Sequence, residues 1–96
     1  MYSIAVSLNA QEEIENIEAL YFKISHKISD KFVLNLSHAY TILERNPFFG
    51  IRYKNYRAVT IEKFPYLLFY EIDEINKKIY ILSCFHASIN SEKYPI

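Results

Sequence analysis

The stretch Leu43-Glu44-Arg45-Asn46-Pro47-Phe48-Phe49-Gly50 divides the sequence into two halves with different hydrophobic periods. Before it, apolar residues recur every three or four positions, which is the period of an amphipathic helix. After it, apolar and polar residues alternate or form short apolar runs, as is typical of strands. Pro47 forbids continuation of a helix, and Gly50, the only glycine, is expected to supply a positive φ in the turn.

The first half predicts one strand and a helical hairpin. Residues Tyr2–Leu8 alternate and are expected to form a strand. Asn9 is the expected N-cap of the first helix, with Glu12 completing a capping box, and Ser29 or Asp30 is the expected N-cap of the second. Two apolar stripes at helical spacing support these helices: Ile14, Ile17, Leu20, Tyr21, Ile24 and Ile28, then Phe32, Leu36, Ala39, Tyr40 and Leu43. The short gap between the stripes predicts an antiparallel pair.

The second half predicts three strands and a polar tail. The strands are expected at Tyr56–Lys63, Leu67–Ile72 and Ile79–His86, and the tail ends at Ile96. The whole chain therefore predicts a single α+β domain spanning residues 1–96, with the order β-α-α-β-β-β. In this arrangement the helical hairpin packs on one face of a mostly antiparallel sheet.

Composition limits the class of protein. A chain of 96 residues supports one core. Cys84 is the only cysteine, the first ten residues lack the features of a signal peptide, and no window approaches the ~20 apolar residues of a membrane span, so a cytoplasmic location is expected. The net charge is zero, which is not typical of a dedicated nucleic-acid binder. Five basic residues and one acidic residue lie between Arg45 and Lys63, which indicates either a basic patch or an ordinary solvated surface.

Three segments together resemble the RelE/ParE family of bacterial toxins. The first is Leu43–Gly50, and the second is Tyr56–Tyr70, which resembles the family's arginine strand followed by Phe-Pro-Tyr and an apolar strand. The third is the closing strand with His86, followed by Lys93 and Tyr94. The order and spacing of the segments carry this resemblance, and it spans essentially the whole chain. It implies a protein that stops growth when free and is neutralised by a partner antitoxin.

Two residues are candidates for catalysis if the chain cleaves RNA without a metal. Arg57 stands in a strand, matches the family's arginine position, and can hold a phosphate through two hydrogen bonds. The alternative is an arginine that pairs with a neighbouring Glu on the sheet surface. His86 can act as a general acid or base, because its ordinary pKa is close to neutrality. The alternative is a histidine that caps a carbonyl at the end of its strand.

Further residues are candidates for binding a nucleic acid or a target protein. Lys54 precedes the arginine strand and can contact phosphate or remain solvated. Lys93 and Tyr94 lie in the tail, where Tyr94 can stack on a base or dock the tail onto the sheet. Many family members carry an arginine three residues after the histidine, but here that position is Ile89, which weakens the nuclease hypothesis. The sequence shows no spacing typical of metal ligands and implies no cofactor.

Three functions remain open at this point. The neutral charge and the missing second arginine favour a ParE-like toxin that inhibits DNA gyrase by binding. A RelE-like endoribonuclease that cleaves mRNA on the ribosome is the alternative, and a degenerate member that only binds antitoxin is a third. The high apolar and aromatic content predicts that part of the surface is covered by an antitoxin segment or a second copy. A homodimer or a toxin–antitoxin hetero-oligomer is therefore expected.

Overall fold

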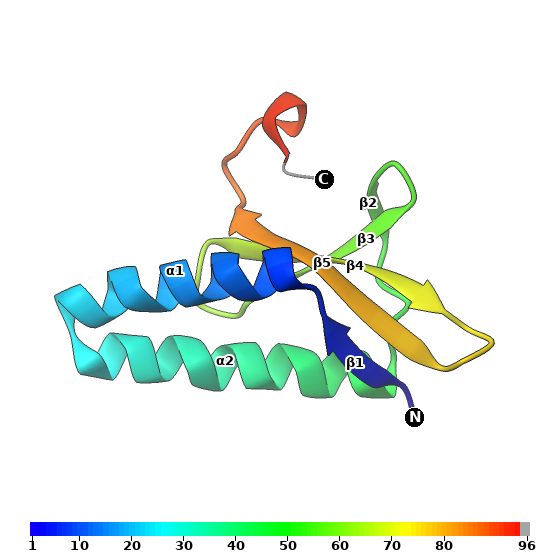
Figure 1. The fold of residues 1–96 in the computed structure, drawn as a ribbon, viewed down its shortest axis with the longest axis horizontal. Helices are drawn as coiled ribbons and strands as arrows, with labels where there is room; N and C mark the ends of the chain where they lie inside the picture. The colour runs from blue at the N-terminus through cyan, green and yellow to red at the C-terminus, as the bar shows by residue number, and fades with distance from the viewer. Residues whose placement is uncertain (95–96) are drawn as a thin grey trace.

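A computed structural model describes residues 1–94 of the chain (Figure 1). Its elements are β1 (Ser3–Val6), α1 (Leu8–Ile24), α2 (His26–Arg45), β2 (Ile51–Tyr53), β3 (Tyr56–Thr60), β4 (Tyr66–Asp73), β5 (Lys78–His86) and a 3-10 turn, η1 (Ser91–Lys93). The expected α+β class and the order of elements are confirmed, with one addition. The short strand β2 forms a hairpin with β3 that the sequence pattern did not indicate. Residues 95–96, the end of the expected domain and tail, lie outside the described range.

The five strands form one mixed sheet in the order β1-β5-β4-β3-β2. β1 runs parallel to β5, and the other neighbouring pairs are antiparallel. The two helices lie antiparallel and side by side across one face of the sheet (Figure 1). The C-terminal segment leaves β5 on the other side (Figure 1). The expected helical hairpin on a mostly antiparallel sheet is confirmed.

Both helices begin earlier than the sequence pattern predicts. The N-cap of α1 is Ser7, whose hydroxyl accepts a hydrogen bond from the Ala10 amide, so the predicted cap at Asn9 was wrong. The N-cap of α2 is Ser25, whose hydroxyl accepts from the Lys27 amide. Ser29 or Asp30 was predicted as this cap, but both residues lie inside α2, where Ser29 is buried. The errors arise because several Ser, Asn and Asp residues lie near each boundary, and all of them are good N-caps.

The turn after α2 differs from the prediction for Gly50. No glycine has a positive φ, whereas Lys54, Lys63 and Lys77 do, each in a turn that joins two strands. The turn is instead fixed by Pro47, which is buried and whose carbonyl accepts a hydrogen bond from the Tyr70 hydroxyl at 2.7 Å. The same carbonyl accepts a hydrogen bond from the Phe49 amide at 3.0 Å. The bond from Tyr70 satisfies the buried hydroxyl and ties the end of α2 to β4.

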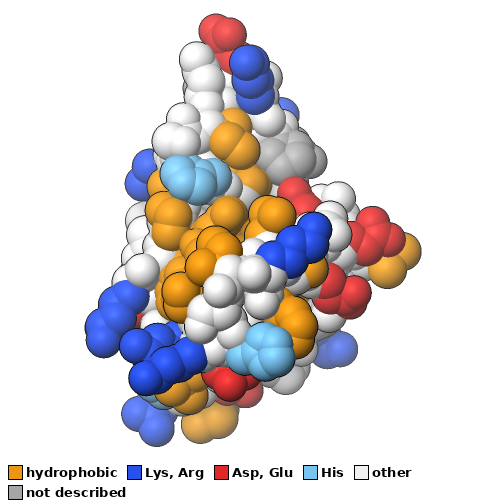
Figure 2. Space-filling view, turned by 90° about the vertical axis from the view of Figure 1, so that its left-hand side faces the viewer, with side chains coloured by type: hydrophobic (Ala, Val, Ile, Leu, Met, Phe, Trp, Pro, Cys, Tyr) orange, Lys and Arg blue, Asp and Glu red, His pale blue; other side chains and the backbone are white. Residues whose placement is uncertain are grey.

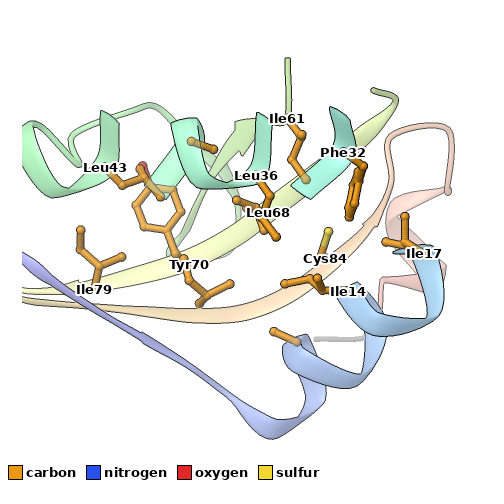
Figure 3. Packing of buried hydrophobic residues seen from close by; sticks show 13 residues of the cluster. Ile14, Ile17, Phe32, Leu36, Leu43, Ile61, Leu68, Tyr70, Ile79 and Cys84 are labelled. Atoms are coloured by element: carbon orange, nitrogen blue, oxygen red, sulfur yellow. The ribbon is translucent and has the colours of Figure 1, made fainter. Parts of the chain in front are cut away.

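The main core lies between the helices and the sheet (Figure 3). Its helical side is formed by residues at positions spaced by three or four, which are Ala10, Ile14, Ile17, Phe32, Leu36, Ala39 and Leu43. Its sheet side is formed by Ile61, Leu68, Tyr70, Ile79, Ile81 and Cys84. The periodicity of the sequence therefore identifies most of this core, but Leu20 and Ile24 of the first predicted stripe are exposed.

The start of α1 is anchored on an irregularity in β5. The pairing of β4 and β5 shifts after Phe69, so Leu82 has no partner and forms a bulge. The free carbonyl of Leu82 accepts hydrogen bonds from the Ser7 hydroxyl and the Asn9 side chain. The Glu13 carboxylate accepts from the Ser83 hydroxyl at 2.7 Å and from the Cys84 amide at 3.2 Å. These bonds satisfy backbone groups that the bulge leaves unpaired.

The other face of the sheet is also apolar. Leu67, Phe69 and Phe85 are buried there, although no helix covers them. Their cover comes from the β2–β3 hairpin and from the C-terminal segment, through Tyr53, Tyr56, Ala58, Ile89 and Tyr94. An antiparallel sheet with one solvated face would alternate apolar and polar residues, so these buried rings show that both faces are packed.

Candidate functional site

Arg57 lies in β3 opposite Tyr70 and is half-buried. It shares a side of β3 with Val59, which packs against the helix-covered core, so both lie on the helix side of the sheet. Its Nη1 donates a hydrogen bond to the Phe49 carbonyl at 2.6 Å, and its guanidinium lies 5.6 Å from the centre of the Phe48 ring. The side chain is therefore held by the loop that follows α2.

An open hollow of about 290 Å³ lies beside this arginine. Its lining residues come from the loop after α2, the β2–β3 turn, β3, the end of β4 and the turn after β4: Phe48, Asn55, Arg57, Glu71, Ile72 and Glu74. Two carboxylates share this hollow with one guanidinium. A phosphate bound at Arg57 would lie close to both carboxylates, so the local electrostatics do not favour a simple anion site.

Tyr70 connects the arginine to the core. Burial raises the pKa of its hydroxyl, while a backbone hydrogen bond in the loop and the nearby Arg57 act in the opposite direction. Tyr70 remains protonated at neutral pH and donates to the Pro47 carbonyl. The loop that carries Phe48 and Phe49 is thus fixed at both ends by strand residues.

His86 lies at the end of β5, opposite Tyr66, and its ring packs edge-on against that tyrosine at 5.4 Å. Its Nδ1 accepts a hydrogen bond from the Ser88 amide at 3.1 Å and lies 2.7 Å from the Ser88 hydroxyl. Since an amide can only donate, Nδ1 carries no proton in this arrangement, and the proton of the neutral ring is on Nε2. The histidine thus accepts from an amide in the turn that follows its own strand.

The structure does not bring Arg57 and His86 together. They belong to strands on either side of β4, opposite Tyr70 and Tyr66 respectively. With ~4.8 Å between strands and ~3.3 Å per residue, their Cα atoms are roughly 16 Å apart. Arg57 reaches toward the loop after α2, whereas His86 packs on Tyr66 at the opposite end of β4. The two side chains are not placed to act on the same phosphate.

Lys54 and Tyr94 both contact the ring of Tyr53, which packs on the helix-free face. The Lys54 ammonium is 5.2 Å from the centre of the Tyr53 ring, and that ring is 5.0 Å from Tyr94. Tyr94 also contacts Phe69 and Phe85, with ring centres 5.2 Å and 4.8 Å away. Tyr94 thus docks the tail onto the sheet, one of the two roles expected for it. Lys93 precedes it in η1 and is exposed.

Several partners of these residues were not identified from the sequence. Lys54 lies over the ring of its sequence neighbour Tyr53, a contact that local sequence can suggest. Arg57 lies over the ring of Phe48, nine positions earlier, and nothing in the local sequence indicates that contact. Ile89, at the position where many family members have arginine, packs into the apolar cluster of the helix-free face. Ile89 therefore contributes apolar packing at a position where an arginine would contribute a positive charge.

Metal binding and membrane insertion were tested on the same residues. Within residues 1–94, no group of three or more His, Cys, Asp or Glu residues is arranged to hold a metal ion. Neither helix in this range has the length and apolar character that crossing a membrane requires.

Comparison with known proteins finds a similarity of fold. No family model matches the chain, and no curated protein matches it. Among solved structures, a chain of the chromosomal ParDE TA system from P. aeruginosa superposes with a TM-score of 0.75. The match covers 92% of this chain and 98% of that chain at 19% sequence identity. At this identity the likeness establishes the fold, and it confirms at that level the resemblance to RelE/ParE toxins that the sequence predicts.

Proposed function

We propose that this chain is the toxin of a type II toxin–antitoxin system and that it inhibits growth by binding DNA gyrase. The observation that carries the proposal is the shared fold over nearly the full length of both chains with a member of a ParDE TA system. A fold alone does not determine function, so the arrangement of the site residues is the second support.

The site residues favour binding over catalysis. RNA cleavage without a metal needs a base, an acid and a cation around one phosphate. Arg57 donates to the Phe49 carbonyl and shares its hollow with Glu71 and Glu74. His86 lies opposite Tyr66, at the other end of β4 from Tyr70, which is the partner of Arg57. A toxin that acts by binding to a surface of its target does not need a base, an acid and a cation arranged around one phosphate.

One observation favours the second candidate, a ribosome-dependent mRNA endoribonuclease. Lys54, Tyr53 and Tyr94 lie together on the helix-free face, next to the buried rings of Phe69 and Phe85. A cation beside aromatic rings is a common arrangement for binding single-stranded RNA. A degenerate member that retains only antitoxin binding is the third candidate, and it shares the fold with both.

The deciding experiment is to induce the chain alone in a bacterial host and to follow the synthesis of DNA and protein by pulse labelling. An early fall in DNA synthesis, together with inhibition of gyrase supercoiling by the purified chain, is the expected result. An early fall in protein synthesis with cleaved mRNA would replace this proposal with the nuclease. Normal growth with folded chain present would leave the degenerate member.

Two site variants, Arg57→Lys and His86→Ala, and one control variant separate the mechanisms further. Arg57→Lys keeps a cation at the position, and Arg52→Ala removes an exposed arginine from the adjacent strand β2. Under the proposal, Arg57→Lys and His86→Ala leave gyrase inhibition within about threefold of the wild type, a free-energy change below about 1 kcal/mol. A nuclease would instead lose most of its activity with either change, and Arg52→Ala would serve as the control for lost charge.

A further inference from the structure

The pairing of β3 with β4 ends before β4 does. Its last pair in this direction is Arg57 with Tyr70, whereas β4 continues to Asp73 and stays paired with β5 to that residue. Beyond Arg57 the chain leads through Tyr56 into the β2–β3 turn, residues 54–55. The sheet therefore has a gap beside the end of β4. We call this gap, together with the hollow beside Arg57 that lies in it, the β4 notch.

Ile72 directs its backbone groups into the β4 notch. In an antiparallel pair, residues that exchange hydrogen bonds with the opposite strand alternate with residues that do not. The Ile61 amide donates to the Tyr66 carbonyl at 3.0 Å, so the even-numbered residues of β4 turn their backbone groups toward β3. In this register Asn55 would be the partner of Ile72, but it lies in the turn, and within residues 1–94 no backbone hydrogen bond joins the two. Ile72 therefore offers a donor and an acceptor to another chain.

The charges in the β4 notch favour a cation. Glu71 and Glu74 line it, and both are exposed. Arg57 lines it as well, but its Nη1 already donates to the Phe49 carbonyl at 2.6 Å. Apolar surface comes from the Phe48 ring, which is 49% exposed. A ligand that carries positive charge beside some apolar surface therefore matches the notch.

We propose that the β4 notch binds an extended, basic segment of a partner protein, which adds to the sheet beside the end of β4. This proposal goes beyond the proposed function and does not depend on it. The segment's residue opposite Ile72 would exchange two backbone hydrogen bonds with it and turn its side chain toward Phe48. The next residue, opposite Glu71, would lie on the helix-free side, where a Lys or Arg would face the carboxylate.

Charge selects this occupant over the alternatives. A nucleic acid would bring phosphates against two carboxylates, and a second copy docked through the same notch would bring these carboxylates against themselves. A basic segment is also not suited to the opposite end of the molecule, where the two helices join. Figure 2 shows Lys and Arg side chains near the hydrophobic side chains gathered on that end. Lys23 and Lys27 belong to the helix ends that meet there.

The test uses the purified chain and synthetic peptides of about six residues with blocked ends, long enough to form a short strand. One peptide alternates valine and lysine, the second alternates valine and glutamate, and the third is the lysine peptide methylated at every backbone amide. Binding is followed through the amide signals of the chain by NMR. The lysine peptide should shift the Ile72 amide signal and slow its hydrogen exchange, because the amide gains an acceptor. The other two peptides should not.

Two charge variants separate the β4 notch from a general attraction of basic peptides. Glu71→Lys should weaken binding of the lysine peptide about fivefold or more, since it replaces an attractive cross-strand pair with a repulsive one. Glu62→Lys should leave binding within about twofold of the wild type. It is the matched control because Glu62 is also exposed, lies in the turn at the other end of β4, and gives the same change of net charge.

Every other result overturns the proposal. Equal losses with both variants would mean that the peptide follows the net charge of the chain. Equal binding of the methylated peptide would mean that no backbone pairing is made. Signal changes confined to residues outside the β4 notch would place the peptide elsewhere. An Ile72 amide that stays unchanged up to the solubility of the lysine peptide would show that the end of β4 does not accept a further strand.

Discussion

Both faces of the sheet contain fully buried side chains, but different elements cover them. Tyr70 faces the helices and Phe69 faces away from them, and both side chains are fully buried. The first face is covered by two helices of 17 and 20 residues. The second is covered by a short hairpin and by the segment after β5, with Tyr94 contacting three of its rings. Since few contacts hold the second cover, that face should open at lower free-energy cost than the first.

The largest effect should come from the helix-covered face. Phe32 is fully buried and packs against Tyr21, Phe64 and Tyr66. Phe32→Ala should lower the free energy of unfolding by about 3–5 kcal/mol, because it removes buried apolar surface and leaves a cavity. A domain of this size has about 5–15 kcal/mol in total, so the variant should be close to unfolding at room temperature. Urea denaturation followed by circular dichroism measures the change.

The neighbouring residue Val33 supplies the control for this prediction. Val33 is exposed on α2. Val33→Ala should change the free energy of unfolding by less than about 0.5 kcal/mol, as expected for a surface substitution. Equal effects of the two substitutions would mean that α2 does not cover the sheet as described.

A smaller effect is expected on the helix-free face. Tyr94→Ala removes three aromatic contacts of a half-buried ring and should cost about 2 kcal/mol, since each such pair contributes about 0.5–1.5 kcal/mol beyond the area it buries. Tyr94→Phe keeps the ring and should cost much less. In the alanine variant, amide hydrogen exchange should quicken around Phe69 and Phe85 and stay unchanged in α2. Faster exchange in both places would show that the two faces open together.

The comparison also shows what sequence alone can predict. The helix-covered face was predicted in detail, because the residues at helical spacing from Ile14 to Leu43 and the strand residues from Leu68 to Cys84 follow simple periods. The helix-free face was not, because its cover depends on contacts between residues far apart in sequence, such as Tyr53 with Tyr94. The strand order, with β1 beside β5, is likewise non-local.

The candidate site was even less accessible to sequence analysis. The residue types of Arg57 and His86 indicated possible chemistry, but their separation depends on the register of β3 and β5 against β4. The N-cap of α1 was predicted at the wrong residue because Ser7 and Asn9 both have the right chemistry. Both side chains donate to the Leu82 carbonyl at the bulge of β5, a contact between residues far apart in the sequence.

Loss of the hydrogen bond from Tyr70 to the Pro47 carbonyl, on the helix-covered face, should lower stability less than Tyr94→Ala does. Tyr70→Phe removes the bond to the Pro47 carbonyl, which keeps the hydrogen bond from the Phe49 amide. The expected cost is about 0.5–1.5 kcal/mol, which is typical of the loss of one hydrogen bond. The loop of Phe48 and Phe49 should become more susceptible to chymotrypsin in this variant. Unchanged stability and unchanged cleavage would show that the loop is fixed by Arg57 alone.

The smallest effect on stability at neutral pH is expected from the titration of Cys84, which is buried on the helix-covered face. Burial raises the pKa of its thiol from 9.0 to about 12, with the Glu13 carboxylate adding to the shift, and burial also raises the pKa of Tyr40 from 10.0 to about 12. The folded state therefore holds both protons more tightly than the unfolded state does. Stability should be constant below about pH 9 and should fall as the pH rises toward 12, since the unfolded state loses these protons first.

Thiol modification tests this prediction and the comparison at once. At pH 8 a thiol reagent should label Cys84 in the native chain only as fast as the helix-covered face opens, because the thiolate is the reactive form. Phe32→Ala should therefore speed labelling strongly. Tyr94→Ala should speed it only as far as it lowers global stability, since the cover that it loosens lies on the opposite side of the sheet. Rapid labelling of the Tyr94→Ala variant while its helices remain protected from exchange would show that Cys84 is reached from the helix-free face, and would contradict this prediction.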